Sequence, residues 1–331
     1  MIYYVTNGWG LLYIFRLRGS VLPKACAWAI PCAAATVLLK HYEPLGYMDL
    51  TGVQEMWGGF TFVLGFVIVF RNNQAYMRFW EGATLIQQVR GEWFNAVSSL
   101  IAFCNNSREK EQRAAVEQFQ HLLVRLMSLL YCCALQQVAV VDDDNFEVID
   151  NTGLDQESLI HLANSVDRCE ILLQWVQRLI VEAHNSGVLQ ISAPILSRSF
   201  QELSRGIVNL NNVRKIKEIP FPFPYSQASM VMLLMHWLFT PLFASQSIQT
   251  TWIAGVTSFL TSAAFWALNY IAQEIEQPFG EDPNDLPIAE MQMDMNRSLC
   301  VLLHPKTQVP PSFRYVRARD TSMLTRPSDL D

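Results

Sequence analysis

The sequence predicts an all-α membrane protein with four transmembrane helices per chain and long cytosolic helices. The first observation is a run of 55 residues, Ile219 to Gln273, without Asp, Glu, Lys or Arg. The second is that only 16% of the 331 residues are charged, against about 25% in soluble domains. The third is a helical spacing of apolar residues through much of the remaining chain, without an alternating strand pattern.

The charge-free run is long enough for two transmembrane helices. A helix needs about 20 apolar residues to cross the hydrocarbon core of a bilayer. A polar stretch from Gln246 to Thr251 divides the run into two apolar halves. A soluble core helix would carry a polar stripe at the 3.6-residue period, and neither half has one. We therefore predict spans over residues 225–246 and 251–273.

Two shorter stretches predict the first two spans. Residues 25–39 and 56–70 contain no charged side chain, but each is about 15 residues long, so each alone would also suit a buried core helix. The second stretch can lengthen inward through polar residues if these face a protected or watery interior. We expect the spans to cover residues 21–40 and 56–78.

The distribution of charge predicts the orientation in the membrane. The loop 41–55 contains Glu43, Asp49 and Glu55 and no Lys or Arg, whereas basic residues flank the other ends of the spans. The positive-inside rule then places both termini in the cytosol or its equivalent. The predicted cytosolic parts are the N-terminal segment 1–20, the helical region 79–218, the acidic region and helix 274–304, and an extended or disordered tail 305–331. The sequence does not identify the membrane.

Composition and motifs exclude several classes of protein. The net charge of −6 and pI near 5.6 argue against nucleic-acid binding, which requires a basic face. The chain contains no Gly-rich phosphate-binding motif and no G-x-S-x-G nucleophile motif. No two His lie at i,i+4 and no C-x-x-C occurs. We therefore expect no enzymatic activity.

A phenylalanine stripe marks the second span. Phe62, Phe66 and Phe70 lie at i, i+4 and i+8 and so share one face of a helix. Packing against lipid or a neighbouring helix is the ordinary interpretation of such a stripe. The abrupt change to Arg71-Asn72-Asn73-Gln74 favours a pore-lining helix that passes from a dry constriction to a wet vestibule.

An acidic loop follows the last span. Glu281, Asp282 and Asp285 lie in a segment interrupted by Pro and Gly. Closely spaced carboxylates and free backbone carbonyls suit Ca²⁺, which takes about six to eight oxygen ligands. The spacing is not that of an EF-hand, so a calcium site and a solvated acidic turn are equally compatible with the residues.

These motifs together resemble the bestrophin family of anion channels. The resemblance rests on Arg18-Gly19-Ser20, on Phe70-Arg71-Asn72-Asn73, on Arg78-Phe79-Trp80-Glu81 and on Pro278-Phe279-Gly280-Glu281-Asp282. The resemblance covers roughly residues 1–300. The motif sequences are closer to those of the bacterial, plant and algal branch than to those of the animal branch. It implies a homopentamer in membrane lipid with one central pore.

The resemblance also implies two constrictions in that pore. It places the narrow neck at Phe62, Phe66 and Phe70, when the motif at Arg78 is aligned without a gap. A competing register would place the neck at Gly58, Phe62 and Phe66; we prefer the first because it leaves no Gly in the constriction. A lower, cytosolic aperture is implied at Ile195, within Ala193-Pro194-Ile195-Leu196.

Animal members of the family bind Ca²⁺ at the acidic loop. The matching side chains here are Asp282 and Asp285, and the matching backbone carbonyls are those of Tyr3, Glu274 and Gln277. This chain has Pro283 and Asn284 where the animal loop has Asp. The resemblance therefore leaves calcium gating open.

The function implied is passive conduction of monovalent anions, namely chloride and related ions such as bicarbonate. The edges of aromatic rings carry a partial positive charge, so they can contact anions weakly in a constriction that excludes water. Arg71 would either raise the local anion concentration or pair with Glu81 or another acid. The two alternatives are a secondary anion transporter and a non-conducting membrane scaffold.

Overall fold

The computed structural model describes residues 2, 15–42, 52–105, 109–139 and 146–314. Within these residues the chain forms nine α-helices and no strand, which confirms the all-α prediction. The helices are α1 (Leu22–Tyr42), α2 (Val53–Ala102), α3 (Lys110–Val138), α4 (Gln156–Asn164), α5 (Arg168–Asn185), α6 (Ala193–Glu218), α7 (Phe223–Ser247), α8 (Thr251–Ile275) and α9 (Ile288–Leu303).

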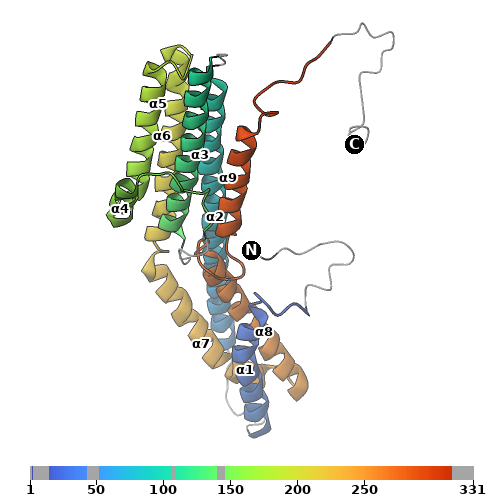
Figure 1. The fold of residues 1–331 in the computed structure, drawn as a ribbon. Coiled ribbons are helices and arrows are strands. Elements are labelled where there is room, and N and C mark those ends of the chain that lie inside the picture. The colour runs from blue at the N-terminus through green and yellow to red at the C-terminus, as the bar shows by residue number, and fades with distance from the viewer. Residues whose placement is uncertain (1, 3–14, 43–51, 106–108, 140–145, 315–331) are drawn as a thin grey trace.

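The molecule is elongated and consists of two bundles that share one helix (Figure 1). The membrane bundle contains α1, α7, α8 and the first half of α2. The distal bundle contains α3 to α6, α9 and the second half of α2. Helix α2 has 50 residues and no Pro, so its backbone hydrogen bonds continue without a break for about 75 Å. The predicted second span ends at residue 78, but the helix itself continues to Ala102.

In the described part of the chain, five helical segments are long and apolar enough to cross a membrane, one more than the four spans predicted. They include α1, α2, α7 and α8, whose bounds lie close to the predicted spans, except that α2 continues far beyond its span. The additional one is α3, and 67% of its most apolar 18-residue window is buried inside the chain. Because α3 packs against α5 and α9, its apolar residues belong to the core of the distal bundle. The number of membrane spans stays a prediction.

Tryptophans join the helices of the membrane bundle. The Trp28 ring of α1 stacks on Trp266 of α8, with ring centroids 4.2 Å apart. Its Nε1–H donates to the Tyr270 hydroxyl at 2.9 Å, and Trp237 of α7 donates its Nε1–H to the Trp28 carbonyl at 2.8 Å. The indoles of Trp28 and Trp237 thus pack their apolar rings inside the bundle while each polar N–H finds a partner on another helix.

The distal bundle is centred on the contact between α2 and α6. Trp93 is fully buried and donates its Nε1–H to the Leu203 carbonyl at 3.3 Å. Gly206 makes room for the indole, because a Cβ at this position would lie 2.0 Å from Trp93 Nε1. The two helices therefore run antiparallel in close contact along the distal bundle.

Candidate functional site

The three phenylalanines of the predicted neck lie on the side of α2 opposite the face that enters the core of the membrane bundle. The exposed fractions are 76% for Phe62, 67% for Phe66 and 38% for Phe70. On the opposite face of the helix, Leu64 and Ile68 are buried in the membrane bundle. The single chain thus presents the Phe stripe to a neighbouring molecule, to lipid or to a pore, and the neck assignment stays a prediction.

Phe70 differs from the other two because it has an aromatic neighbour on another helix. Its ring centroid lies 5.8 Å from that of Tyr225, in the first turn of α7. Tyr225 in turn lies 6.0 Å from Phe221, in the segment that joins α6 to α7. Phe70, the residue of the stripe nearest to the distal bundle, therefore contacts the region where the membrane bundle meets the distal bundle.

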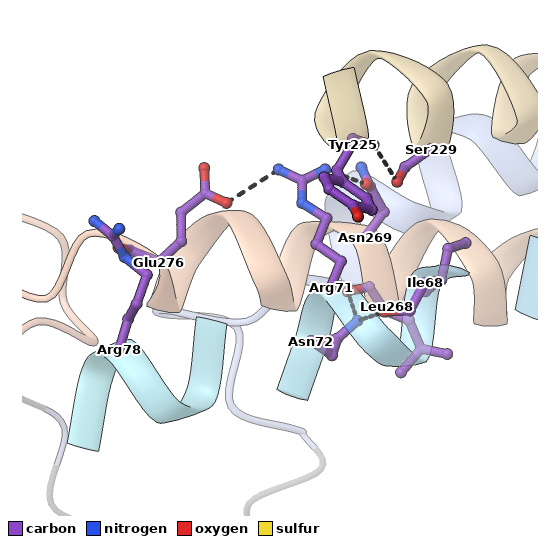
Figure 2. Close-up of polar contacts among 9 residues, drawn as sticks. All are labelled: Ile68, Arg71, Asn72, Arg78, Tyr225, Ser229, Leu268, Asn269 and Glu276. Carbon is purple, nitrogen blue, oxygen red and sulfur yellow. Dashed lines mark hydrogen bonds and ion pairs between the residues drawn. The ribbon is translucent and has the colours of Figure 1, made fainter. Parts of the chain in front are cut away.

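Arg71 is buried between α2 and α8, with 5% of its surface exposed (Figure 2). Its Nη1 donates to Asn269 Oδ1 and its Nη2 to Glu276 Oε2, both at 3.1 Å. The acid that pairs with Arg71 is thus Glu276, and the alternative partner Glu81 is wrong. Because the guanidinium is neutralised and covered, the alternative role of Arg71 in concentrating anions has no support in its position.

Arg78 and Asn72 also fasten α2 to its neighbours. Arg78 donates to the carbonyls of Ile216 and Ile219 at the end of α6, and to the carbonyl of Glu276 at the end of α8. Asn72 Nδ2 donates to the Leu268 carbonyl of α8 at 3.0 Å (Figure 2). The expectation that the polar stretch after Phe70 faces a wet vestibule is therefore wrong for Arg71, which is buried against α8. Asn72 also binds α8 but is partly exposed.

Ile195 lies in the first turn of α6 and is about half exposed. Trp93 contacts Leu203, so the antiparallel helices place Ile195 roughly 45 Å from Phe70 along the molecule, at 1.5 Å per residue. The predicted neck and the predicted aperture thus lie far apart, on the two helices α2 and α6 that pack together through the distal bundle (Figure 1).

The acidic loop after α8 contains a buried carboxylate. Asp285 is 3% exposed, its Oδ2 accepts the N–H of Asp282 at 2.8 Å, and its Oδ1 is buried with no partner among the described residues. Burial, helped by the nearby carboxylates of Asp282 and Glu274, raises the pKa of Asp285 to about 6. An unpartnered, buried carboxylate oxygen is a vacant ligand for a cation.

A backbone carbonyl converges on the same place. The position that a Cβ would take on Gly280 lies 2.6 Å from Asp285 Oδ2 and 3.8 Å from the Gln277 carbonyl oxygen. The carboxylate of Glu274 is engaged with Lys24 Nζ at 2.7 Å, which leaves only its carbonyl for a cation. Tyr3 lies outside the described residues.

The described residues contain no group of three or more His, Cys, Asp or Glu side chains that could hold a metal ion. A cation in the loop would therefore depend on backbone carbonyls as well as on Asp282 and Asp285, and such a mixture of oxygens suits Ca²⁺. The loop also reaches the N-terminal segment, because Asn284 Nδ2 donates to the Gly19 carbonyl at 2.9 Å.

Three residues that the structure brings to this region were not predicted from the sequence: Tyr225, Asn269 and Glu276. A signal existed for Asn269, which is a polar amide within a predicted span, and polar side chains at membrane depth usually have a structural or functional partner. Glu276 is the second acid after the charge-free run, two residues beyond Glu274. Nothing in the local pattern distinguishes Tyr225.

Comparison with known proteins gives the family. Residues 5–301 match the family model described as "Bacterial/Fungal Bestrophin protein". The chain belongs to the bestrophin family. A crystal structure of a bacterial bestrophin homolog from Klebsiella pneumoniae aligns with 86% of this chain and 100% of its own, with a TM-score of 0.68 and 18% sequence identity.

Two cyanobacterial relatives are named voltage-dependent anion channel-forming proteins. The Nostoc protein is 27% identical over 322 residues, which cover 94% of this bestrophin and 96% of the relative. The Synechocystis protein is 24% identical over 301 residues, which cover 90% and 92% of the two chains. The similarity therefore extends over both bundles.

Proposed function

We propose that this bestrophin is a passive anion channel, in which several copies of the chain surround a central pore lined by Phe62, Phe66 and Phe70. The observation that carries the proposal is the exposed Phe stripe on a membrane helix whose other face is buried in its own bundle. The names of the cyanobacterial relatives support an anion as the conducted ion. The family and the names of these relatives point to a channel, so no enzymatic role is proposed.

The stripe requires further copies of the chain before it can act as a constriction. One helix cannot enclose an ion, whereas five copies would form three stacked rings of five Phe each, which is the homopentamer that the resemblance implies. The remaining apolar surface of the membrane bundle would contact lipid. Both termini and the distal bundle would lie on the cytosolic side, as the charge distribution predicts.

The chemistry of the rings suits weak and rapid passage. Each Phe presents a positive ring edge to an anion that has lost part of its water, and no fixed charge at the neck holds the ion back. An apolar constriction also controls conduction by excluding water. Chloride and bicarbonate are the anions proposed, and Ile195 is proposed as the second, cytosolic constriction.

Planar-bilayer recording tests the neck. We expect the purified wild type to conduct anions, and the triple variant Phe62→Ala, Phe66→Ala, Phe70→Ala to show a changed conductance and a changed preference among anions. Leu260→Ala is the matched control, because Leu260 is an exposed apolar residue of α8 outside the stripe. An unchanged current in the triple variant removes these residues from the pore.

The same recordings separate the two alternative functions. A reversal potential that follows the gradient of a second, coupled ion would identify a secondary transporter instead of a channel. Absence of any current from correctly assembled wild type would identify a non-conducting scaffold. A fivefold particle with α2 innermost in electron microscopy is the expected assembly, and a monomer or dimer would contradict the pore.

We also propose that the acidic loop binds Ca²⁺. The ligands would be the carboxylates of Asp282 and Asp285 and the carbonyls of Tyr3, Glu274 and Gln277. Calcium should then raise the thermal unfolding temperature of the wild type in detergent, and Asp285→Asn should abolish this rise. Glu281→Gln is the control within the loop, because Glu281 is outside the ligand set. Equal stabilisation of the wild type and Asp285→Asn would contradict the site.

A further inference from the structure

A pocket of about 240 Å³ lies beside the half of α2 that belongs to the distal bundle. Four of its lining residues come from α2, and Ser298 comes from α9. The residues from α2 are Gln87, Arg90, Gly91 and Phe94. The volume is several times that of a chloride ion, so an anion could enter together with some of its water.

Arg90 brings a positive charge with unused donors to this pocket. Within the part of the chain that the structure describes, only its Nη2 has partners, the Ser298 hydroxyl at 3.1 Å and the Asp294 carbonyl at 3.4 Å. Among the described residues no carboxylate forms an ion pair with Arg90, because the Asp294 carboxylate is paired with Arg297 at 3.1 Å. The Arg90 guanidinium can therefore donate further hydrogen bonds to an anion, and such charge-assisted bonds are the stronger kind.

The space beside the guanidinium is open, and none of the residues that line it is acidic. A Cβ built on Gly91 would meet no other atom within 4 Å. The Gln87 side chain adds amide N–H donors to the lining, and Phe94 adds an aromatic ring. Glu92 is directed elsewhere, because its Oε2 accepts the Asn209 amide of α6 at 2.9 Å. The lining thus suits a small monovalent anion.

The pocket opens beside the face of α2 that carries the Phe stripe. Gly91 follows Phe66 by 25 residues, which is about seven turns at 3.6 residues per turn, so the two residues lie on nearly the same face. The helix between them is unbroken. If the Phe stripe faces the pore axis, Gly91 also faces it, about 37 Å further along the helix.

We propose that this pocket is an anion-binding site in the wall of the conduit beyond the neck, with Arg90 as its principal ligand. The position on the conduit rests on the proposed channel function, whereas the ligand chemistry rests on the pocket alone. Five such sites in a pentamer would raise the local concentration of the conducted anion.

Bromide is a chloride-sized probe that diffraction locates through its anomalous scattering. Crystals of the full chain soaked in sodium bromide should show a peak within hydrogen-bond distance of Arg90 in the wild type and none in Arg90→Gln. A peak that persists in Arg90→Gln denotes an adventitious ion only and overturns the proposal. So does a pocket filled by a side chain of a neighbouring copy.

Single-channel recording supplies the functional test. Arg90→Gln and Gly91→Phe should each lower the anion conductance about two- to fivefold at low salt, and the difference should shrink at high salt, where charges are screened. Gly91→Phe fills the open space and serves if Arg90→Gln does not fold. Arg113→Gln is the control, since it removes an exposed arginine from α3.

The outcomes keep the two proposals distinct. Wild-type conductance in both pocket variants overturns the anion site and leaves the channel function intact. A wild type without anion current overturns the channel function, and the bromide experiment then decides the site by itself.

Discussion

The two halves of α2 show how one helix can serve two environments. In the distal bundle Trp93, Val97 and Leu100 are fully buried by α3 and α6 of the same chain. In the membrane bundle Phe62 and Phe66 are more than two-thirds exposed on a helix of the same regularity. The distal half completes its core within one chain, whereas the membrane half leaves an apolar face that lipid or other copies must cover.

The junction between the two halves of α2 is held by charged side chains. Arg71 and Arg78 connect α2 to the end of α8 through the side chain and the backbone of one residue, Glu276. Buried charged contacts of this kind select one arrangement of the helices, because any other arrangement leaves a charge without a partner. Substitutions in the buried distal half, at the charged junction and in the exposed membrane half should therefore change stability and conduction by different amounts.

The largest effect is expected in the distal half. Trp93→Ala removes a fully buried tryptophan side chain and its hydrogen bond to Leu203, and should lower the free energy of unfolding by about 3–5 kcal/mol. Thermal unfolding in detergent measures the loss. Trp80→Ala on the exposed face of the same helix is the matched control and should change the stability of the single chain little. Equal losses of stability in Trp93→Ala and Trp80→Ala would contradict the conclusion that the distal half of α2 completes its core within one chain.

The junction should show the next largest effect. Glu276→Ala leaves the Arg71 guanidinium buried without its acid, and we expect a loss of about 2–3 kcal/mol after allowance for the partial exposure of Glu276. Glu117→Ala breaks an exposed pair with Arg113 and should cost less than about 1 kcal/mol. The same measurement compares the two, and a loss at Glu276 no larger than at Glu117 would show that the junction is not held by this pair.

The next effect is expected at the predicted neck, when Tyr225, which contacts Phe70, is substituted. Tyr225→Ala removes the aromatic contact with Phe70, which is worth about 0.5–1.5 kcal/mol. Such a change corresponds to a shift of about two- to tenfold in an equilibrium between neck conformations. We expect a larger anion current from Tyr225→Ala in bilayers and wild-type current from Tyr225→Phe, which keeps the ring. A current unchanged by loss of the ring would separate Tyr225 from the neck.

The smallest effect concerns the dependence of stability on pH. Burial, together with the nearby carboxylate of Glu202, raises the pKa of Glu92. A raised pKa means that the folded chain favours the protonated acid, so this contribution to stability is present below about pH 4.5 and is lost as the pH rises through the raised pKa. Glu92→Gln should flatten this part of the pH profile of the unfolding temperature, whereas Glu117→Gln should leave it unchanged.

The sequence determined the features that depend on local patterns. The charge-free run predicted α7 and α8 to within a few residues, because hydrophobic length is counted along the chain. The shared face of Phe62, Phe66 and Phe70 followed from the helical period, and the structure shows all three on the side away from the bundle core. The family was visible in short motifs, and the match to residues 5–301 confirms it.

Only the tertiary structure decided which segments meet. Arg71 and its acid Glu276 are 205 residues apart, and nothing near Arg71 in the chain distinguishes that acid from Glu81. The apolar pattern of α3 likewise satisfies the length and composition of a span, yet the surrounding helices bury it in the distal bundle. A local pattern sets the conformation and apolar face of a helix, whereas the partner of that face depends on how distant helices pack together.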